Sequence, residues 1–406
     1  MKIVVLKFGG TSVGNIERIK KVAKIITTYK KKKFKVIVVS SAMSGITNDL
    51  IKKSQKISSS FDQAEYDTLL ASGEQISCAL IAGRLNEIGY KSRSWLSWQI
   101  PIITNGPHKA ARIAKIDKKK ILKYINSGGI PIITGFQGID DNFRITTLGR
   151  GGTDASAIMI AKFFDATNCV IYTDVEGVYT TDPNLVKNAK KIPQISYEEM
   201  LELASQGAKV LQTRSVELAM RKKTKLSVRS SIKPNKSGTL VTEENSKLEN
   251  NTVSGIAYSK DEAKITLSKV LDKPGVSSKI FGPLSKGNIN VDMILQNVSQ
   301  DGKYANLSFT LPRGDLEKAL KILKKEKSSI GYRKINSSNN ISKISVVGVG
   351  MRSHAGVAQT LFETLGKNKI NIQVITTSEI KISILIDDQF TDLAVQKLHQ
   401  AYKLHK

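Results

Sequence analysis

The stretch Ile3-Val4-Val5-Leu6-Lys7-Phe8-Gly9-Gly10-Thr11-Ser12 decides the fold. Its four leading apolar residues predict a buried strand, and the two glycines let the chain turn sharply after it. Glycine also lets backbone N–H groups converge on an anion, and a helix predicted from Asn15 to about Tyr29 adds partial positive charge at its N-terminus. A lysine beside such a turn suits a polyphosphate, although a glycine pair after a strand is usually only a turn.

Two later segments have the same character. Residues 146–156 place three glycines and Arg150 before a predicted helix, with Thr153 or Asp154 as its N-cap. The spacing is neither that of a P-loop nor that of a dinucleotide fingerprint, and a flexible connection is the alternative. Residues 172–183 follow a predicted buried strand, so Asp174 lies just past a carboxyl end, where ligands bind in open α/β sheets.

The first 240 or so residues alternate short apolar runs with amphipathic ones, which predicts a mostly parallel sheet sandwiched by helices. One helix is predicted to begin at Ser72, with Gln75 completing a capping box and with a buried stripe that includes Ile76, Ala79, Leu80 and Ile88. The strands are predicted at 2–8, 36–41, 100–104, 130–135, 169–173 and 225–229. A polar stretch at 237–252 is predicted to be a linker.

After this linker the sequence repeats itself. A run with Gly275-Val276 and Ile289-Asn290-Val291 recurs with Gly356-Val357 and Ile370-Asn371-Ile372. Each copy is predicted to form a strand, a glycine-containing turn, an amphipathic helix and a second strand. The duplication could serve assembly alone, but polar side chains gather at its turns and strand starts, where a polar ligand would need them.

Composition narrows the class of protein. The formal net charge of +28 comes mostly from lysines in solvated runs, with few arginines and no basic groove rich in aromatic residues, so nucleic-acid binding is disfavoured. No run of 18 apolar residues occurs, so no membrane partner is expected. Cys78 and Cys169 lie in apolar segments as small core residues, and a cytoplasmic location is expected.

On its motifs the chain resembles the aspartate kinases of the amino acid kinase family, over nearly all of its length. The resemblance implies an amino acid kinase domain at 1–245, followed by α+β ferredoxin-like ACT domains at 258–335 and 341–406, with a strand from 252–259 available to complete the second. Related kinases lack the GEQIS segment and the paired tail domains. The motifs are KFGGTS (7–12), VSSAMSGITN (39–48), ASGEQIS (71–77), TGFQG (134–138), TTLGRGGTDAS (146–156), YTDVEGVYTTDP (172–183), DKPG (272–275), NINVDMILQNVS (288–299) and TTSEIKISILI (376–386).

The resemblance implies that MgATP phosphorylates the β-carboxylate of L-aspartate to 4-phospho-L-aspartate, the first step from aspartate toward lysine, threonine and methionine. Asp174 would organise the nucleotide phosphates, Mg²⁺ or Lys7, and Glu74 would pair with the substrate ammonium unless it is only a favourable first-turn glutamate. No metal site made by the protein alone is expected. The implied catalytic residues are Lys7, Arg150 and Asp174; the substrate residues are Ser41, Thr47, Glu74, Arg150, Gly151, Gly152 and Thr153; the ATP residues are Lys7, Phe8, Gly9, Gly10, Thr173, Asp174, Tyr179, Asp182, Pro183 and Lys209.

The paired ACT domains imply feedback inhibition by lysine, threonine or both, and a homo-oligomer joined through these domains. A kinase for another acid, such as glutamate, and a regulatory protein without catalysis are the alternatives; the GEQIS segment counts against the first, and the presence of Lys7, Arg150 and Asp174 against the second. The implied effector residues are Asp272, Gly275, Asn290, Asp292, Gln296, Asn371, Ile372, Thr376, Thr377 and Glu379.

Overall fold

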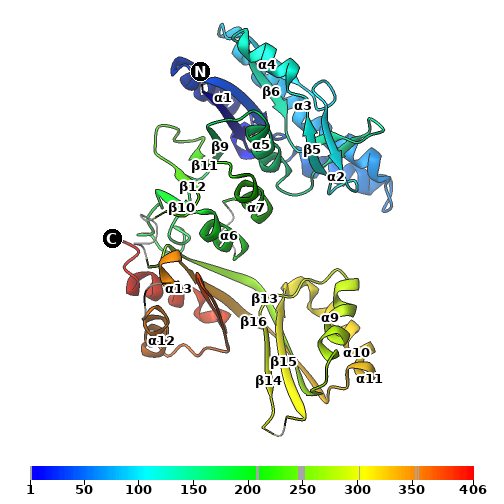
Figure 1. Cartoon of the computed structure of the whole chain (residues 1–406), viewed down its shortest axis with the longest axis vertical. Helices are drawn as coiled ribbons and strands as arrows, with labels where there is room; N and C mark the ends of the chain where they lie inside the picture. The colour runs from blue at the N-terminus through cyan, green and yellow to red at the C-terminus, as the bar shows by residue number, and fades with distance from the viewer. Residues whose placement is uncertain (1, 207–209, 246–251, 301, 353, 355) are drawn as a thin grey trace. The chain divides into compact units, whose positions relative to one another are not determined.

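The computed structural model describes residues 2–206, 210–245, 252–300, 302–352, 354 and 356–406 (Figure 1). They divide into two compact units. The first holds the described residues up to 179, 191–205 and the stretch from 210 to 245, and the second holds 180–190, 206 and everything from 252 onward. In the described part of the chain, no helix is long and apolar enough to cross a membrane.

The first unit is built on a large sheet that is parallel except where β12 meets β11, as the apolar runs predicted. Its strands, in spatial order, are β10 (Gln194–Ser196), β12 (Thr239–Thr242), β11 (Leu226–Ser230), β9 (Asn168–Thr173), β1 (Ile3–Phe8), β2 (Lys35–Ser40), β6 (Ile130–Thr134) and β3 (Ser92–Trp95). A smaller sheet contains β5 (Arg112–Ile116), β4 (Ile102–Asn105), β7 (Gln137–Ile139) and β8 (Ile145–Thr147).

The helices of this unit cover the large sheet on both faces. Val4, Leu6 and Phe8 of β1 point to one face and pack in a core with α1 and α3, while α5 packs against β1 and β9. A strand with helices on both sides is buried throughout, which is why its sequence is continuously apolar. The helices are α1 (Ile16–Lys31), α2 (Ile46–Ile57), α3 (Gln63–Glu87), α4 (Lys119–Asn126), α5 (Gly152–Phe163), α6 (Tyr197–Ser205) and α7 (Thr213–Lys222).

Two predictions about helix starts are wrong. Helix α3 begins at Gln63, capped by the Asp62 side chain, and Ser72 lies in its middle, with its hydroxyl donating to the Leu69 carbonyl. Helix α5 begins at Gly152 with Gly151 as its N-cap, two or three residues before the predicted cap. In both cases a residue suited to capping lies inside the helix, because a suitable residue type does not by itself end hydrogen bonding along the backbone.

The predicted buried stripe of α3 is also wrong. Ile76 is 48% exposed and Leu80 is 36% exposed, whereas Ser77, Cys78 and Ile81 are buried. The helix packs on α1 and β3 through a face that combines apolar Ile81 and Leu85 with small and polar residues such as Cys78 and Ser77. The prediction maximised apolar content on one side, while the packing uses a face that also holds the polar residues of the site.

The second unit contains one antiparallel sheet whose long strands β13 and β16 lie side by side (Figure 1). In spatial order its strands are β14 (Ile294–Val298), β15 (Tyr304–Leu311), β13 (Gly255–Leu271), β16 (Lys334–Val347), β18 (Lys381–Asp387) and β17 (Val374–Ser378). Its helices are α9 (Val276–Lys286), α10 (Leu316–Lys325), α11 (Lys327–Ile330), α12 (Val357–Lys367) and α13 (Thr391–Ala401).

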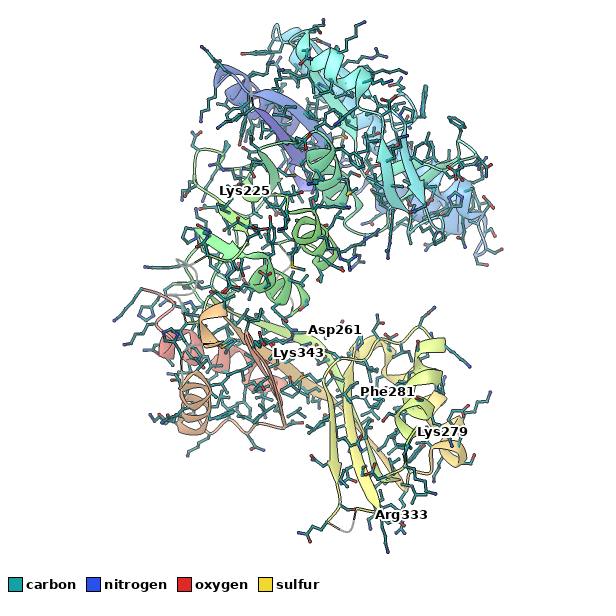
Figure 2. All side chains as sticks on the ribbon, in the orientation of Figure 1. Lys225, Asp261, Lys279, Phe281, Arg333 and Lys343 are labelled. Carbon is teal, nitrogen blue, oxygen red and sulfur yellow. The ribbon has the colours of Figure 1, made fainter. Side chains whose placement is uncertain are left out.

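The internal repeat is visible at matching turns of this unit. Gly275 caps α9 and Gly356 caps α12, with φ of +88° and +97°, a left-handed conformation that favours glycine. Phe281 of α9, labelled in Figure 2, meets Phe309 of β15 edge-on at 5.3 Å in the core of the first copy. The start of β13, at Gly255–Ser259, pairs with β16 at Lys343–Val347, beside the core of the second copy.

Candidate active site

A cavity of about 320 Å³ opens in the first unit where β1, β2 and α5 meet the N-terminal glycine turn. It brings together residues of five of the segments that the sequence singled out, although Lys7 and Asp154 are 147 positions apart along the chain. Its lining residues are Lys7, Gly10, Ser41, Ala42, Met43, Ser44, Gly45, Thr47, Asn48, Glu74, Phe136, Gly149, Arg150, Gly151, Gly152, Thr153 and Asp154.

Lys7 is the cation at one side of the cavity. It is the second-to-last residue of the buried strand β1, and its Nζ is 2.6 Å from Oδ1 of Asp154 on the first turn of α5. Both side chains are about nine-tenths buried. A buried ion pair of this kind fixes the lysine in one place, while its remaining ammonium protons stay available to an anion in the cavity.

Glu74 lies opposite a buried backbone amide rather than a cation. Its Oε1 accepts from the Ala42 amide at 2.9 Å, and its Oε2 is buried without a hydrogen bond in the described part of the chain. Burial raises the pKa of the Glu74 carboxyl from 4.5 to about 7, although the Ala42 amide opposes this rise. A cation that enters the cavity would therefore lower this pKa and favour the ionised form of Glu74.

The position of Glu74 also removes the alternative that it is only a favourable first-turn residue. Glu74 is the twelfth residue of the 25-residue helix α3, far from the partial positive charge at the N-terminus. The macrodipole therefore does not explain a buried carboxylate at this place, which leaves the contact with a ligand as the stronger interpretation.

Arg150 lies on a loop whose backbone only glycine supports comfortably. Gly149 and Gly151, on either side of it, both have φ of +74°. The Arg150 side chain is exposed at the mouth of the cavity, while Gly152 and Thr153 begin helix α5 beneath it. An arginine here can bind a carboxylate in a bidentate geometry. Ser41 and Thr47, predicted as substrate contacts, also line the cavity.

The predicted ATP residues do not all have a group available to a ligand. The Phe8 ring is fully buried and stacks on Tyr172 at 5.0 Å, so only its backbone is available to a ligand. The Gly9 amide donates to the Tyr172 carbonyl at 3.2 Å, which removes it as a phosphate donor in this state. Thr173 ends β9, beside β1, and its Oγ1 donates to the next residue, exposed Asp174, at 3.0 Å.

The remaining ATP residues follow β9 along the chain. Tyr179 is half-buried in the first unit, where it forms an isolated bridge with Lys191. Asp182 and Pro183 belong to the 180–190 segment of the second unit, and Asp182 accepts from the Tyr258 hydroxyl at 3.2 Å. Lys209 lies outside the described residues. Lys7 itself pairs with Asp154, and the role of Asp174 stays a prediction.

The predicted effector residues lie in matching regions of the two repeats. Gln296 of β14 donates to Asp272, just after β13, at 3.3 Å, so two of them adjoin. Asp292, before β14, instead pairs with Lys343 of β16, labelled in Figure 2, which also contacts Glu262 at 3.1 Å. Asn290 and Ile372 precede their edge strands, and Gly275 caps α9. Asn371 precedes β17, Thr376 and Thr377 lie in it, and Glu379 follows it.

Sequence reasoning missed Asp154 as a site residue. It was considered only as a helix cap, because an aspartate after a glycine loop is common at that position. The signal that could have found it is the geometry of parallel sheets: α5 leads into β9, which adjoins β1, so the first turn of α5 reaches the carboxyl end of β1. Asn48, Met43 and Phe136 were likewise missed as lining residues.

Comparison with known proteins agrees with this geometry. The family model described as the amino acid kinase family matches residues 2–230, and the ACT domain model matches 268–326 and 344–402. An aspartate kinase of Pseudomonas putida is 46% identical, with 100% of this chain and 98% of that protein covered. An aspartokinase of Helicobacter pylori is 44% identical, with 99% of each covered.

Among solved structures, aspartokinase III of E. coli in complex with aspartate and ADP superposes with a TM-score of 0.80 at 26% identity. The match covers 98% of this chain and 99% of that one. The chain therefore belongs to the amino acid kinase family. Within it, the full-length relatives and the paired ACT domains place the chain among the aspartate kinases, as the motifs indicated.

Proposed function

We propose that the cavity binds L-aspartate and that the protein transfers the γ-phosphoryl group of ATP to its β-carboxylate. The observation that carries this proposal is Glu74: a buried carboxylate with one unpartnered oxygen, facing a cavity that also holds a lysine and an arginine. A ligand with one ammonium and two carboxylates complements this arrangement. The E. coli relative, whose structure contains aspartate and ADP, supports the same assignment.

The reaction requires positioning and charge neutralisation more than covalent help from the protein. Glu74 would hold the α-ammonium and Arg150 a substrate carboxylate, leaving a β-carboxylate oxygen to form the new O–P bond. As the bond from the γ-phosphorus to the β–γ bridging oxygen breaks, negative charge grows on ADP and on the transferring oxygens. Lys7, held by Asp154, would stabilise that charge. The product is the acyl phosphate, 4-phospho-L-aspartate.

The residues near β9 fit a Mg²⁺ that is bound mostly by phosphates. Asp174 is a single exposed carboxylate there, and no group of three Asp, Glu, His or Cys side chains converges on a metal position in the described ranges. Mg²⁺ usually keeps waters and binds through one or two carboxylates together with substrate phosphates. It would neutralise phosphate charge, and Asp174 would orient it.

An ADP-release assay with aspartate, glutamate and N-acetylglutamate, each with MgATP, tests the proposed reaction. We expect turnover with aspartate and little with the other two acids. N-acetylglutamate lacks the free ammonium that would pair with Glu74, and glutamate is one methylene longer than aspartate. Faster turnover of glutamate than of aspartate would overturn the choice of substrate. Absence of ADP release with all three acids would overturn the activity itself.

We propose further that the ACT repeats bind lysine, threonine or both as feedback effectors of aspartate-derived amino acid synthesis, in the cytoplasm. The adjoining Asp272 and Gln296 offer a carboxylate and an amide to an α-ammonium. The E. coli relative has been solved with lysine, described there as a T-state. A thermal-shift panel of aspartate-pathway amino acids tests the assignment, and a panel without any shift would contradict it.

A homo-oligomer joined through the ACT repeats is part of this proposal. The two edge strands of the second unit, β14 and β17, carry exposed Ile294, Val298 and Ile375. Open edges with apolar side chains favour pairing with another chain. Light scattering at micromolar concentration should give a dimer or a dimer of dimers, and a monomer would contradict it.

A further inference from the structure

Asp67 is a buried carboxylate outside the cavity that the proposed chemistry does not use. It lies on α3, seven residues before Glu74, so two helical turns separate the two acids and place them on one side of the helix. Asp67 is fully buried. A buried carboxylate is costly unless hydrogen bonds satisfy its oxygens, so its partners reveal what it does.

In the described part of the chain, the hydrogen bonds of Asp67 lead to the loop after β4 and to the end of β8. Oδ1 accepts from the Thr147 hydroxyl at 2.7 Å, and Oδ2 accepts from the Thr147 amide at 2.9 Å. Oδ2 also contacts Nδ1 of His108 at 2.8 Å and accepts from the Lys109 amide at 3.1 Å. One side chain thus fastens the loop after β4 and the end of β8 to the same point of α3.

The fastened point is three residues before Arg150. Thr147 ends β8, and the chain then passes through Gly149 and Gly151, whose φ of +74° is a left-handed conformation that favours glycine. The loop after β4 supports this segment: Ala111 donates to the Thr147 carbonyl at 3.0 Å, and the Lys109 carbonyl lies 2.6 Å from where a Cβ on Gly149 would be. Arg214 donates to the Leu148 carbonyl at 2.5 Å and to the Ala111 carbonyl at 3.2 Å.

We propose that Asp67 is a positioning residue that fixes the Arg150 loop relative to Glu74. Helix α3 carries both acids, so it would fix the distance between Glu74, which would bind the substrate ammonium, and Arg150, which would bind a substrate carboxylate. The separation of these groups is what distinguishes one amino acid from a longer or shorter one. This inference rests on the proposed function, because it assigns Glu74 and Arg150 to the two ends of the substrate.

The sharpest test removes one hydrogen bond to Asp67 while the volume of the side chain at residue 147 stays nearly constant. Thr147→Val removes the hydroxyl that donates to Asp67, whereas Thr147→Ser keeps it, and Asp67→Asn keeps the shape but loses the charge. We expect Thr147→Val and Asp67→Asn to raise the KM for aspartate by about tenfold or more, as for loss of a hydrogen bond to a charged group. The KM for ATP should stay within about twofold, and Thr147→Ser should resemble the wild type.

A second readout needs no substrate. Trypsin cleaves after exposed Arg150, and mass spectrometry can follow that one cut in the folded protein. Thr147→Val and Asp67→Asn should speed the cut, and Thr147→Ser should not. Val22→Ala, on the buried face of α1, serves as a control that lowers the melting temperature without touching the loop. It should leave both the cut and the KM for aspartate unchanged.

The outcomes separate the two proposals. Suppose that the wild type phosphorylates aspartate. If Thr147→Val and Asp67→Asn then leave the KM for aspartate unchanged, or raise the KM for aspartate and for ATP in step with lost stability, Asp67 contributes to stability only and the positioning role is wrong. If the wild type does not turn over aspartate, the proposed function fails, and cleavage after Arg150 alone then decides whether Asp67 holds the loop; an unchanged cut would overturn that as well.

Discussion

Glu74 is the residue whose surroundings make the clearest pH prediction. Because burial raises the pKa of its carboxyl to about 7, the free enzyme holds this group protonated below that pH. An ammonium binds the ionised form, so the KM for aspartate should rise by about tenfold per pH unit below about 7 and be flat above it. Glu74→Gln should raise the KM and remove this pH dependence; a steep dependence that survived in Glu74→Gln would contradict the assignment.

The same pKa has a consequence for stability. A carboxyl whose pKa is higher in the folded state than in the unfolded state stabilises the fold most at low pH. The contribution of Glu74 should be complete below about 4.5 and lost as the pH rises to about 7. Aspartate at saturating concentration should reverse the loss, because its ammonium pairs with the ionised carboxylate; melting temperatures with and without aspartate across this range measure it.

Lys7 should matter to turnover rather than to binding of aspartate. Lys7→Met removes the charge that would stabilise the transferring phosphoryl group, and we expect kcat to fall by about a thousandfold. Lys20→Met, on the surface of α1, is the matched control and should leave kcat unchanged. Steady-state ADP release measures both variants, with circular dichroism to verify folding. A loss of less than tenfold in Lys7→Met would exclude a role in phosphoryl transfer.

At the scale of elements, Asp62 caps helix α3, whereas Ser72 only has a residue type that is common at caps. The Asp62 carboxylate accepts from the Ala64 and Glu65 amides at 3.0 and 2.9 Å, whereas the Ser72 hydroxyl returns to its own helix. Asp62→Ala should therefore lower the melting temperature, and Ser72→Ala should leave it nearly unchanged. The reverse order in calorimetry would mean that the helix begins where the sequence suggested.

The turn after β13 carries the prediction about regulation. Asp272 is exposed and adjoins Gln296, outside the cavity of the first unit. Asp272→Ala should abolish inhibition by the effector that the thermal-shift panel identifies and leave the uninhibited kcat unchanged. Lys273→Ala at the neighbouring exposed position is the control and should stay inhibited. Full inhibition of Asp272→Ala would move the effector site elsewhere in the repeats.

At the scale of the whole molecule, the chain between β9 and β10 supplies part of the second unit. Val186 is buried in the core formed by the start of β13, β16, β18, α12 and α13, with Leu185 and Ala189 packed against it. Thr180 Oγ1 contacts Nε2 of the buried His399 at 2.9 Å, and the Ile256 amide donates to the Thr180 carbonyl at 2.7 Å. The prediction of one catalytic domain over residues 1–245 does not include the exchange of residues 180–190 into the second unit. The predicted domain limits stay predictions.

Val186→Ala should therefore weaken the second unit, although the residue lies far from the ACT repeats in sequence. Loss of two buried carbons and the cavity left behind should lower the free energy of opening of β16 and β18 by about 2 kcal/mol. Native-state hydrogen exchange measures this quantity strand by strand. Val175→Ala, in the same connection but 37% exposed, should change it little; equal effects of the two variants would refute the packing of this segment.

Local patterns in the sequence were sufficient for six strands of the first unit and for the segments that form the cavity, but not for the shorter strands, and β12 lies inside the predicted linker. Apolar runs of four to six residues become parallel strands, and glycines become turns, because both depend on the backbone and its nearest neighbours. The matching glycines of the ACT repeats follow for the same reason. Lys7 could be chosen because it directly follows four apolar residues, and Arg150 because it lies among three glycines before a helix, whereas Glu74 came from the resemblance to the aspartate kinases.

Only the tertiary structure decided which of these residues meet. The start of α3, its buried face and the Lys7–Asp154 ion pair depend on how α3 and α5 lie on the sheet. The same holds for Asp67, whose partners lie 41 and 80 residues away along the chain. Burial and long-range hydrogen bonds result from the packing of the whole chain, and a local sequence pattern does not contain that information.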